Sequence, residues 1–225
     1  MVKTVNGVDY AFRWCPPGSF MMGSPEGEGL RMEIPQHRVT LTKGFWMLET
    51  KVTQEMWESV MGDNPSNFKG LNLPVETVSW DDCQEFCEKL SQQSGFKIQL
   101  PTEAQWEYAC RAGTTGEYSG TGNLDEMGWY YGNSDTKTHP VGEKKPNAWG
   151  LFDMHGNVWE WCQDRYEVYS DSAVTDPTGP DSGSNRVVRG GSWYSFAEDC
   201  RSANRFYDTP TYRGNRLGLR LVFVP

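Results

Sequence analysis

Residues 100–109 read Leu-Pro-Thr-Glu-Ala-Gln-Trp-Glu-Tyr-Ala, and this stretch contains a complete start signal for a helix. Thr102 can cap the helix by accepting a backbone hydrogen bond, and Gln105, three positions later, completes a capping box. Trp106, Ala109 and Cys110 then share one helical face. The stretch therefore predicts a helix that begins after Thr102 and packs a tryptophan into the core.

Two more helices are predicted on the N-terminal side of this stretch. Ser79 can cap the first of them, which ends at Gly95. Its apolar residues recur at helical spacing and are Trp80, Cys83, Phe86, Cys87 and Leu90. A shorter helix begins after Thr53, and its apolar stripe consists of Met56, Trp57 and Val60.

The remainder of the chain predicts strands and turns. Residues 10–24 form two strands joined by a turn at Pro16-Pro17-Gly18, and residues 37–50 alternate as another half-buried strand. Residues 113–185 hold turn-forming residues too often for long elements, and 165–185 predict an exposed loop. We expect the last strand, Leu219–Val224, in the core sheet, with residues 194–216 looping out between it and a strand at Val187-Val188.

The composition indicates one loop-rich domain, residues 1–225, that is held together by aromatic packing. The mean hydropathy of −0.67 is low for a domain with a large core. Ten Trp, ten Tyr and ten Phe nevertheless supply enough apolar area to bury. The net charge of −9 argues against nucleic acid and anionic membranes as partners. No apolar run is long enough to span a bilayer. Residues 1–20 hold no signal peptide, so an export signal or lipid anchor is expected outside this chain.

Six cysteines in 225 residues are too few for a disulfide scaffold. Cys83 and Cys87 lie four apart on a predicted helix, but no second metal-ligand pair follows them. We therefore expect both to be small buried hydrophobic residues instead of zinc ligands.

Eight stretches, in order along nearly the whole chain, resemble the formylglycine-generating-enzyme (sulfatase-modifying-factor) family. They are PGSFMMGS at 17–24, VT at 52–53, PVETVSW at 74–80, LPTEAQWEYA at 100–109, NAWGLFDM at 147–154, GNVWEW at 156–161, RGGSW at 189–193 and LGLR at 217–220. None is specific alone, but together they are. The resemblance implies an α+β, C-type-lectin-like fold of the formylglycine-generating-enzyme type, with much irregular structure.

The enzymes of this family oxidise a sulfatase cysteine with two cysteines of their own and copper. If residues are counted from the Gly-Gly-Ser motif without gaps, the cysteine pair of the enzymes falls on Ser195 and Cys200. An alignment with a gap instead matches Cys200 to a third, structural cysteine of the family. The resemblance then places Cys200 near Cys110. Cys162 is another possible partner for Cys200. Either way the pair is broken, and a hydroxyl does not replace a thiolate on copper(I). The resemblance therefore predicts no copper and no oxidase activity.

Some family members bind calcium beside the GNVWEW stretch. Carried over to this chain, the ligands are the carboxylates of Asp153 and Glu160 and the backbone carbonyls of Gly156 and Val158, which suit a hard cation. Alternatively, the two carboxylates only hydrogen-bond the backbone of a tight turn. His37, His139 and His155 show no ligand spacing and are expected to be ordinary surface or partly buried residues.

The segment 194–216 is rich in Tyr, Phe, Ser, Asp, Asn, Gly and Arg, a mixture typical of binding loops. A subset of the family resembles the displayed variable proteins of diversity-generating retroelements, a treponemal one among them, in which the region between RGGSW and LGFR is rewritten at template adenines. This chain keeps the framework CRSANR at 200–205 inside a variable region at 186–224. The positions that resemblance assigns to variation are Tyr194, Ser195, Phe196, Asp199, Phe206, Tyr207, Asp208, Thr211, Tyr212, Gly214, Asn215 and Arg216.

The leading hypothesis is a non-catalytic, monomeric binding protein at the cell surface or outside the cell. Its variable positions would contact a protein or other macromolecular ligand. The alternatives are an oxidase acting on sulfatase cysteines and a structural module of a larger protein.

Overall fold

The three predicted helices begin where the sequence predicts, and the second of them ends at Gly95 as expected. The computed structural model describes residues 1–225 and contains α1 (Gln54–Met61), α2 (Trp80–Ser94) and α3 (Glu103–Arg111). The side chains of Thr53, Ser79 and Thr102 accept the expected backbone hydrogen bonds, with complete capping boxes on α2 and α3. Gly62 and Gly95 end α1 and α2 in the left-handed conformation, which glycine adopts without a steric penalty. A short helix, α4 (Leu124–Met127), was not predicted.

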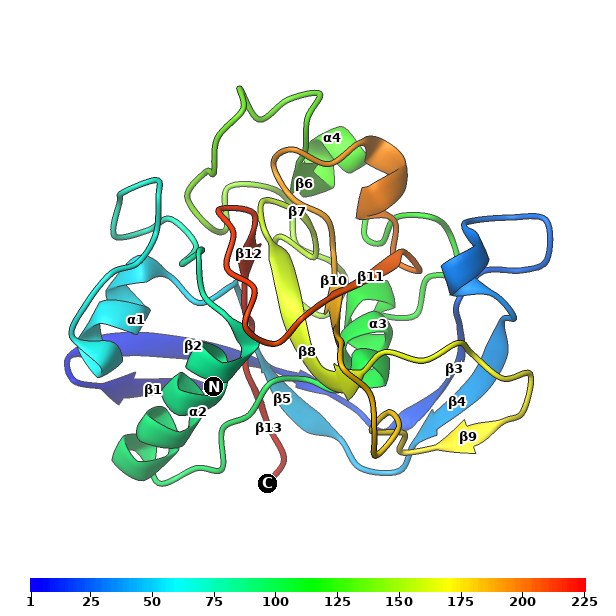
Figure 1. The fold of residues 1–225 in the computed structure, drawn as a ribbon, viewed down its shortest axis with the longest axis horizontal. Coiled ribbons are helices and arrows are strands. Elements are labelled where there is room, and N and C mark those ends of the chain that lie inside the picture. The colour runs from blue at the N-terminus through cyan, green and yellow to red at the C-terminus, as the bar shows by residue number, and fades with distance from the viewer.

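The strands form four small sheets (Figure 1). The first contains β1 (Val2–Val5), β2 (Val8–Cys15), β5 (Phe45–Leu48) and β13 (Val222–Phe223), all antiparallel. The second has the order β11 (Arg205–Asp208), β10 (Arg186–Arg189), β8 (Trp159–Arg165) and β12 (Leu217–Gly218). The others are β3 (Gly18–Met22), β4 (His37–Leu41) and β9 (Val174–Thr175), and the pair β6 (Gly128–Trp129) and β7 (His155–Gly156).

Residues 37–50 form two strands instead of the single strand that their alternation predicts. The chain leaves β4 after Leu41 and enters β5, in a different sheet, at Phe45. Gly44 precedes β5 and presses against the ring of Trp14, where an added Cβ would lie 2.3 Å from a ring carbon. The break therefore depends on a close tertiary approach that no local pattern records.

Two further predictions about strands need correction. Residues 194–216 are not only a loop, because they contain a 3₁₀ turn at Ala197–Cys200 and strand β11, which pairs with β10. The region 113–185 also holds β8, a seven-residue strand bonded to both β10 and β12. The terminal strand does lie in a core sheet, as expected, but only Val222–Phe223 pairs with β5.

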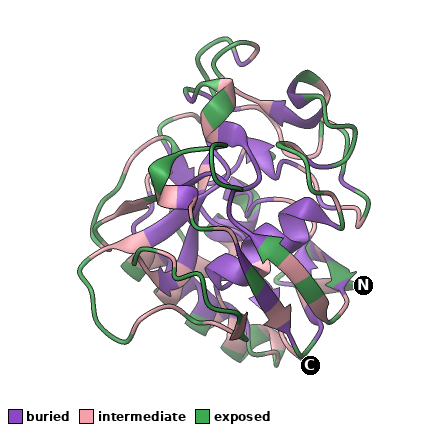
Figure 2. Cartoon of the chain, turned by 90° about the vertical axis from the view of Figure 1, so that its right-hand side faces the viewer, coloured by how far each residue is buried: buried purple, intermediate pink, exposed green.

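The core is divided into two apolar clusters. One lies between α1, α2 and the β1–β2–β5–β13 sheet, and it includes Cys83 and Cys87, as expected of small buried hydrophobic residues. The other surrounds α3, which packs against β8 and β10 and contains the fully buried Trp106. The exposed residues are concentrated in the connecting loops (Figure 2). The helices are all too short or too polar to cross a membrane.

Candidate functional site

The C-terminal segment lines an open cavity of about 510 Å³. Nine of the twelve positions predicted to vary border it, and they are Tyr194, Ser195, Phe196, Asp199, Phe206, Asp208, Tyr212, Gly214 and Arg216. They come from the turn after β10, from β11 and from the turn before β12, which the β11–β10–β8–β12 sheet brings side by side (Figure 1). We call this cavity the groove.

Exposed aromatic rings dominate the groove. Phe196 is 62% exposed, and Tyr194, Phe206 and Tyr212 are each exposed by more than two fifths. The rings are held in place by one another: Tyr131 lies 5.6 Å, between ring centroids, from both Tyr194 and Phe196. Rings that are large, exposed and already ordered lose little entropy when a partner covers them.

Three predicted positions lie outside the groove, and one inside it is hidden. Tyr207 lies against Tyr166, with 4.2 Å between their ring centroids, while Thr211 is exposed on the turn beyond β11. The backbone oxygen of Asn215 accepts a hydrogen bond from the Trp193 indole. Ser195 borders the groove but is only 7% exposed, and its hydroxyl bonds to Ser192.

Five other groove residues were not predicted to belong to the binding site. Leu30 and Met32 come from the segment around the 3₁₀ turn at Arg31–Glu33, more than 150 residues upstream of the predicted positions. Trp159, Val188 and Leu217 complete the wall from β8, β10 and β12. Trp159 lies in the GNVWEW stretch and Leu217 begins the LGLR stretch, and the outward orientation of Trp159 follows from strand alternation on β8.

Buried ion pairs hold the framework stretch 200–205 beneath the groove. Arg201 binds the Glu33 carboxylate through two hydrogen bonds of 2.8 and 2.6 Å. Arg205 binds Glu103 in the same manner, at 2.7 and 2.6 Å. All four side chains are less than one tenth exposed. Since bidentate pairs fix both position and orientation, the backbone that carries the exposed aromatics is held rigidly from below.

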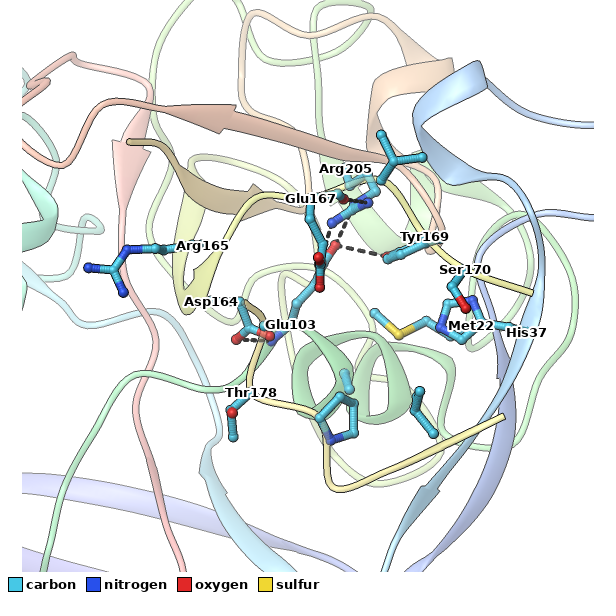
Figure 3. Close-up of a pocket in the computed structure, with 15 residues that line it drawn as sticks. Met22, His37, Glu103, Asp164, Arg165, Glu167, Tyr169, Ser170, Thr178 and Arg205 are labelled. Carbon is cyan, nitrogen blue, oxygen red and sulfur yellow. Dashed lines mark hydrogen bonds and ion pairs between the residues drawn. The ribbon is translucent and has the colours of Figure 1, made fainter. Parts of the chain in front are cut away.

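A second cavity, of about 240 Å³, is lined by Glu103, Tyr169 and Arg205 among others (Figure 3). Arg205 borders both cavities, and its guanidinium lies 3.8 Å from the centre of the Tyr169 ring. The Tyr169 hydroxyl donates to Glu103, which is also paired with Arg205. Asp164 accepts from the Glu103 backbone nitrogen at 2.9 Å, and burial raises the pKa of its carboxyl to about 8.

The position of the first family cysteine holds Ser195. All six cysteines of the chain are buried free thiols. Burial, followed by the neighbouring Asp199, raises the pKa of Cys200 far above its usual range. The Cys110 thiol lies 3.8 Å from His155 Nε2, while the Cys200 backbone carbonyl contacts Nδ1. Neither Cys110 nor Cys162 is joined to Cys200 by a disulfide.

His155 is fully buried, which corrects the expectation of a surface or partly buried histidine; His37 is buried as well, and only His139 is partly exposed. The backbone N–H of Ser119 donates to His155 Nε2, so Nδ1 carries the proton and donates to the Cys200 carbonyl at 2.7 Å. Burial lowers the pKa of His155 to about 4, and the imidazole is therefore neutral.

This buried imidazole predicts a dependence of stability on pH. The folded-state pKa lies below the ordinary value of 6.5, so stability is present above pH 6.5 and is lost as the pH falls towards 4. Each pKa unit corresponds to about 1.4 kcal/mol. We expect the wild type to lose about 3 kcal/mol more unfolding free energy over this range than His155→Asn does. Urea titrations at several pH values measure the difference, and parallel curves for the two proteins would contradict it.

The residues expected to bind calcium do not fit the ion in this arrangement. Both oxygens of Glu160 are engaged, by the Lys51 ammonium, the Arg220 guanidinium and the Trp106 indole. Asp153 accepts from the Gly142 backbone through Oδ2, while its Oδ1 is buried without a partner. No group of three or more His, Cys, Asp or Glu side chains is placed to hold a metal. Glu160 therefore serves as an ion-pair partner here, because two cationic side chains already neutralise it.

Comparison with known proteins places this geometry in a family. Residues 10–224 match the sulfatase-modifying factor enzyme 1-like domain. The chain superposes on Treponema denticola variable protein 1 with a TM-score of 0.94 and 33% identity, covering 100% of this chain and 99% of that one. It is 35% identical to formylglycine-generating enzyme of Mus musculus, over 90% of this chain but only 56% of the enzyme. It is 33% identical to chaperone protein LppX of Paenibacillus barcinonensis, over 70% of this chain and 71% of that protein.

These similarities confirm the resemblance and the fold class predicted from the sequence. The fold is α+β and C-type-lectin-like, of the formylglycine-generating-enzyme type, with four small sheets and few helices. The curated relatives include enzymes, whereas the variable protein matches the whole chain in structure.

Proposed function

The chain belongs to the sulfatase-modifying factor enzyme 1-like domain family, and from this premise we propose that it is a non-catalytic binding protein whose C-terminal residues are diversified. One observation carries the proposal. Nine positions assigned to variation from sequence alone surround a single open groove, whereas the framework between them is buried in ion pairs. Such a division lets side chains at the surface change while the fold is kept.

The groove chemistry favours a macromolecular ligand, most simply a protein. Several exposed aromatics border the groove together with two carboxylates, Asp199 and Asp208, and the exposed guanidinium of Arg216. Aromatic anchors with a polar rim are typical of protein interfaces. The net charge of −9 disfavours nucleic acid. We propose that the chain acts as one monomeric domain displayed at the cell surface or outside the cell, where varied ligands are met.

A second candidate function is oxidation of sulfatase cysteines, because formylglycine-generating enzyme is 35% identical to this chain. Against it stand Ser195 at the first cysteine position and the buried, protonated thiol of Cys200. Conversion of a sulfatase peptide in the presence of copper, measured by mass spectrometry, would establish this alternative.

The DNA beside the gene tests the diversification directly. We expect a near-copy of the region that encodes residues 186–224, differing almost only at adenines that map to the twelve predicted positions. A reverse-transcriptase gene should lie close to it. A genome in which the 3′ end of the gene has no such copy would contradict diversification, and the groove would then be a fixed binding site.

A further inference from the structure

Lys51 lies in a charge cluster that is buried in the interior of the domain. Its side chain is completely inaccessible to solvent, and its ammonium is paired with Glu160. The Arg220 guanidinium binds the same carboxylate at 3.0 Å through both Nε and Nη2. The Trp106 indole donates to it at 2.7 Å. Every side chain in this cluster is fully buried.

A second carboxylate, Asp153, belongs to the cluster. Its Oδ1 is buried without a hydrogen-bond donor, and its backbone is left-handed, with φ of 56°. Burial raises the pKa of Asp153, and Lys51 acts against that rise. An ammonium has three N–H donors, and only one bond, to Glu160, is formed. The carboxylates thus face a cation supplied by the chain itself.

The cluster already contains two cationic side chains. Lys51 and Arg220 both pair with Glu160, and their charges keep the pKa of its carboxyl low. A divalent cation beside them would bring like charges together in a site without solvent, which is strongly unfavourable in a low-dielectric interior. The ammonium also occupies the space beside Glu160 that a metal ion would need.

We propose that the Lys51 ammonium replaces the calcium ion that the family resemblance implied at Asp153 and Glu160. The cation is built into the chain, so this turn is stable without metal.

The turn at residues 153–158 connects the charge cluster to the segment that forms the groove. The Gly156 backbone nitrogen donates to Gly190 at 2.7 Å, and the Asn157 carbonyl accepts from the Trp193 nitrogen, also at 2.7 Å. Gly190 and Trp193 belong to the segment that leads into the first groove residues. We therefore expect the groove to stay ordered in the absence of calcium, whatever its ligand.

Thermal unfolding with millimolar calcium chloride, and with a chelator, tests the replacement. The wild type should melt at the same temperature in both. Lys51→Ala opens space and exposes two carboxylates, so we expect its Tm to rise by about 4 °C or more with calcium. Lys51→Met is the matched control, since it removes the charge but fills the space. Its Tm should not respond to calcium.

Either of two results would overturn the proposal. One is a lower Tm of the wild type in chelator, and the other is a folded Lys51→Ala variant whose Tm does not change with calcium. If Lys51→Ala folds only with calcium, the replacement is supported. If it folds in neither condition, equilibrium dialysis of the wild type with radioactive calcium decides, because stoichiometric binding contradicts the replacement and its absence supports it.

Discussion

Replacing Arg205 with alanine is expected to lower the free energy of unfolding by about 3–5 kcal/mol, because the change leaves a buried carboxylate without its main partner. Arg205 is 1% exposed and forms two hydrogen bonds with Glu103 and one with the Glu167 carbonyl. Arg189 approaches Glu103 only to 3.4 Å, so it compensates poorly for the loss. Urea denaturation followed by tryptophan fluorescence measures the change.

Arg216 provides the matched control, because it lies in the same segment and borders the same groove. Its side chain is exposed, and its guanidinium lies 5.4 Å from the centre of the Tyr194 ring. Arg216→Ala should therefore change the unfolding free energy by no more than about 0.5 kcal/mol. Equal effects of the two substitutions would contradict the separation of a buried framework from a variable surface.

Trp106→Ala is expected to cost about 3–5 kcal/mol for the cavity alone. The ring is fully buried in the core around α3, and the guanidinium of Arg189 lies 5.3 Å from its centre. The indole also donates to Glu160, so about 1–3 kcal/mol more is lost when that hydrogen bond is removed. A domain of ordinary stability would unfold, and circular dichroism of the purified variant measures this.

Trp106→Phe separates the two contributions. Phenylalanine keeps most of the packing but lacks the indole N–H, so its loss should be clearly smaller than that of alanine. If both variants were equally unstable, the hydrogen bond to Glu160 and not the ring volume would dominate at this position. If both were as stable as the wild type, the central role of this tryptophan would be wrong.

Local signals predicted the helices well. The caps at Thr53, Ser79 and Thr102 depend on residues three or four apart, and all three formed as expected. The same holds for Cys83 and Cys87, which a helical face placed in the core. These features could be predicted because a cap or an apolar stripe involves only neighbours in sequence.

The strands and the charge clusters could not be predicted in this way. Gly44 breaks residues 37–50 because of Trp14, thirty positions earlier, and β11 forms because β10 is available as its partner. Glu160 looked like a calcium ligand until the structure placed Lys51, from 109 positions upstream, against it. A carboxylate in a sequence does not reveal which cation will be packed beside it.

By itself, the sequence determined the family, the fold class, the starts of three helices and the residues assigned to variation, because each depends on order and spacing along the chain. Only the tertiary structure decided that nine of those residues share one groove with Leu30 and Met32. It alone also decided that arginines and a lysine bind the buried glutamates. The physical reason is that burial makes an unpaired charge costly, so partners are fixed by folded proximity and not by distance in sequence.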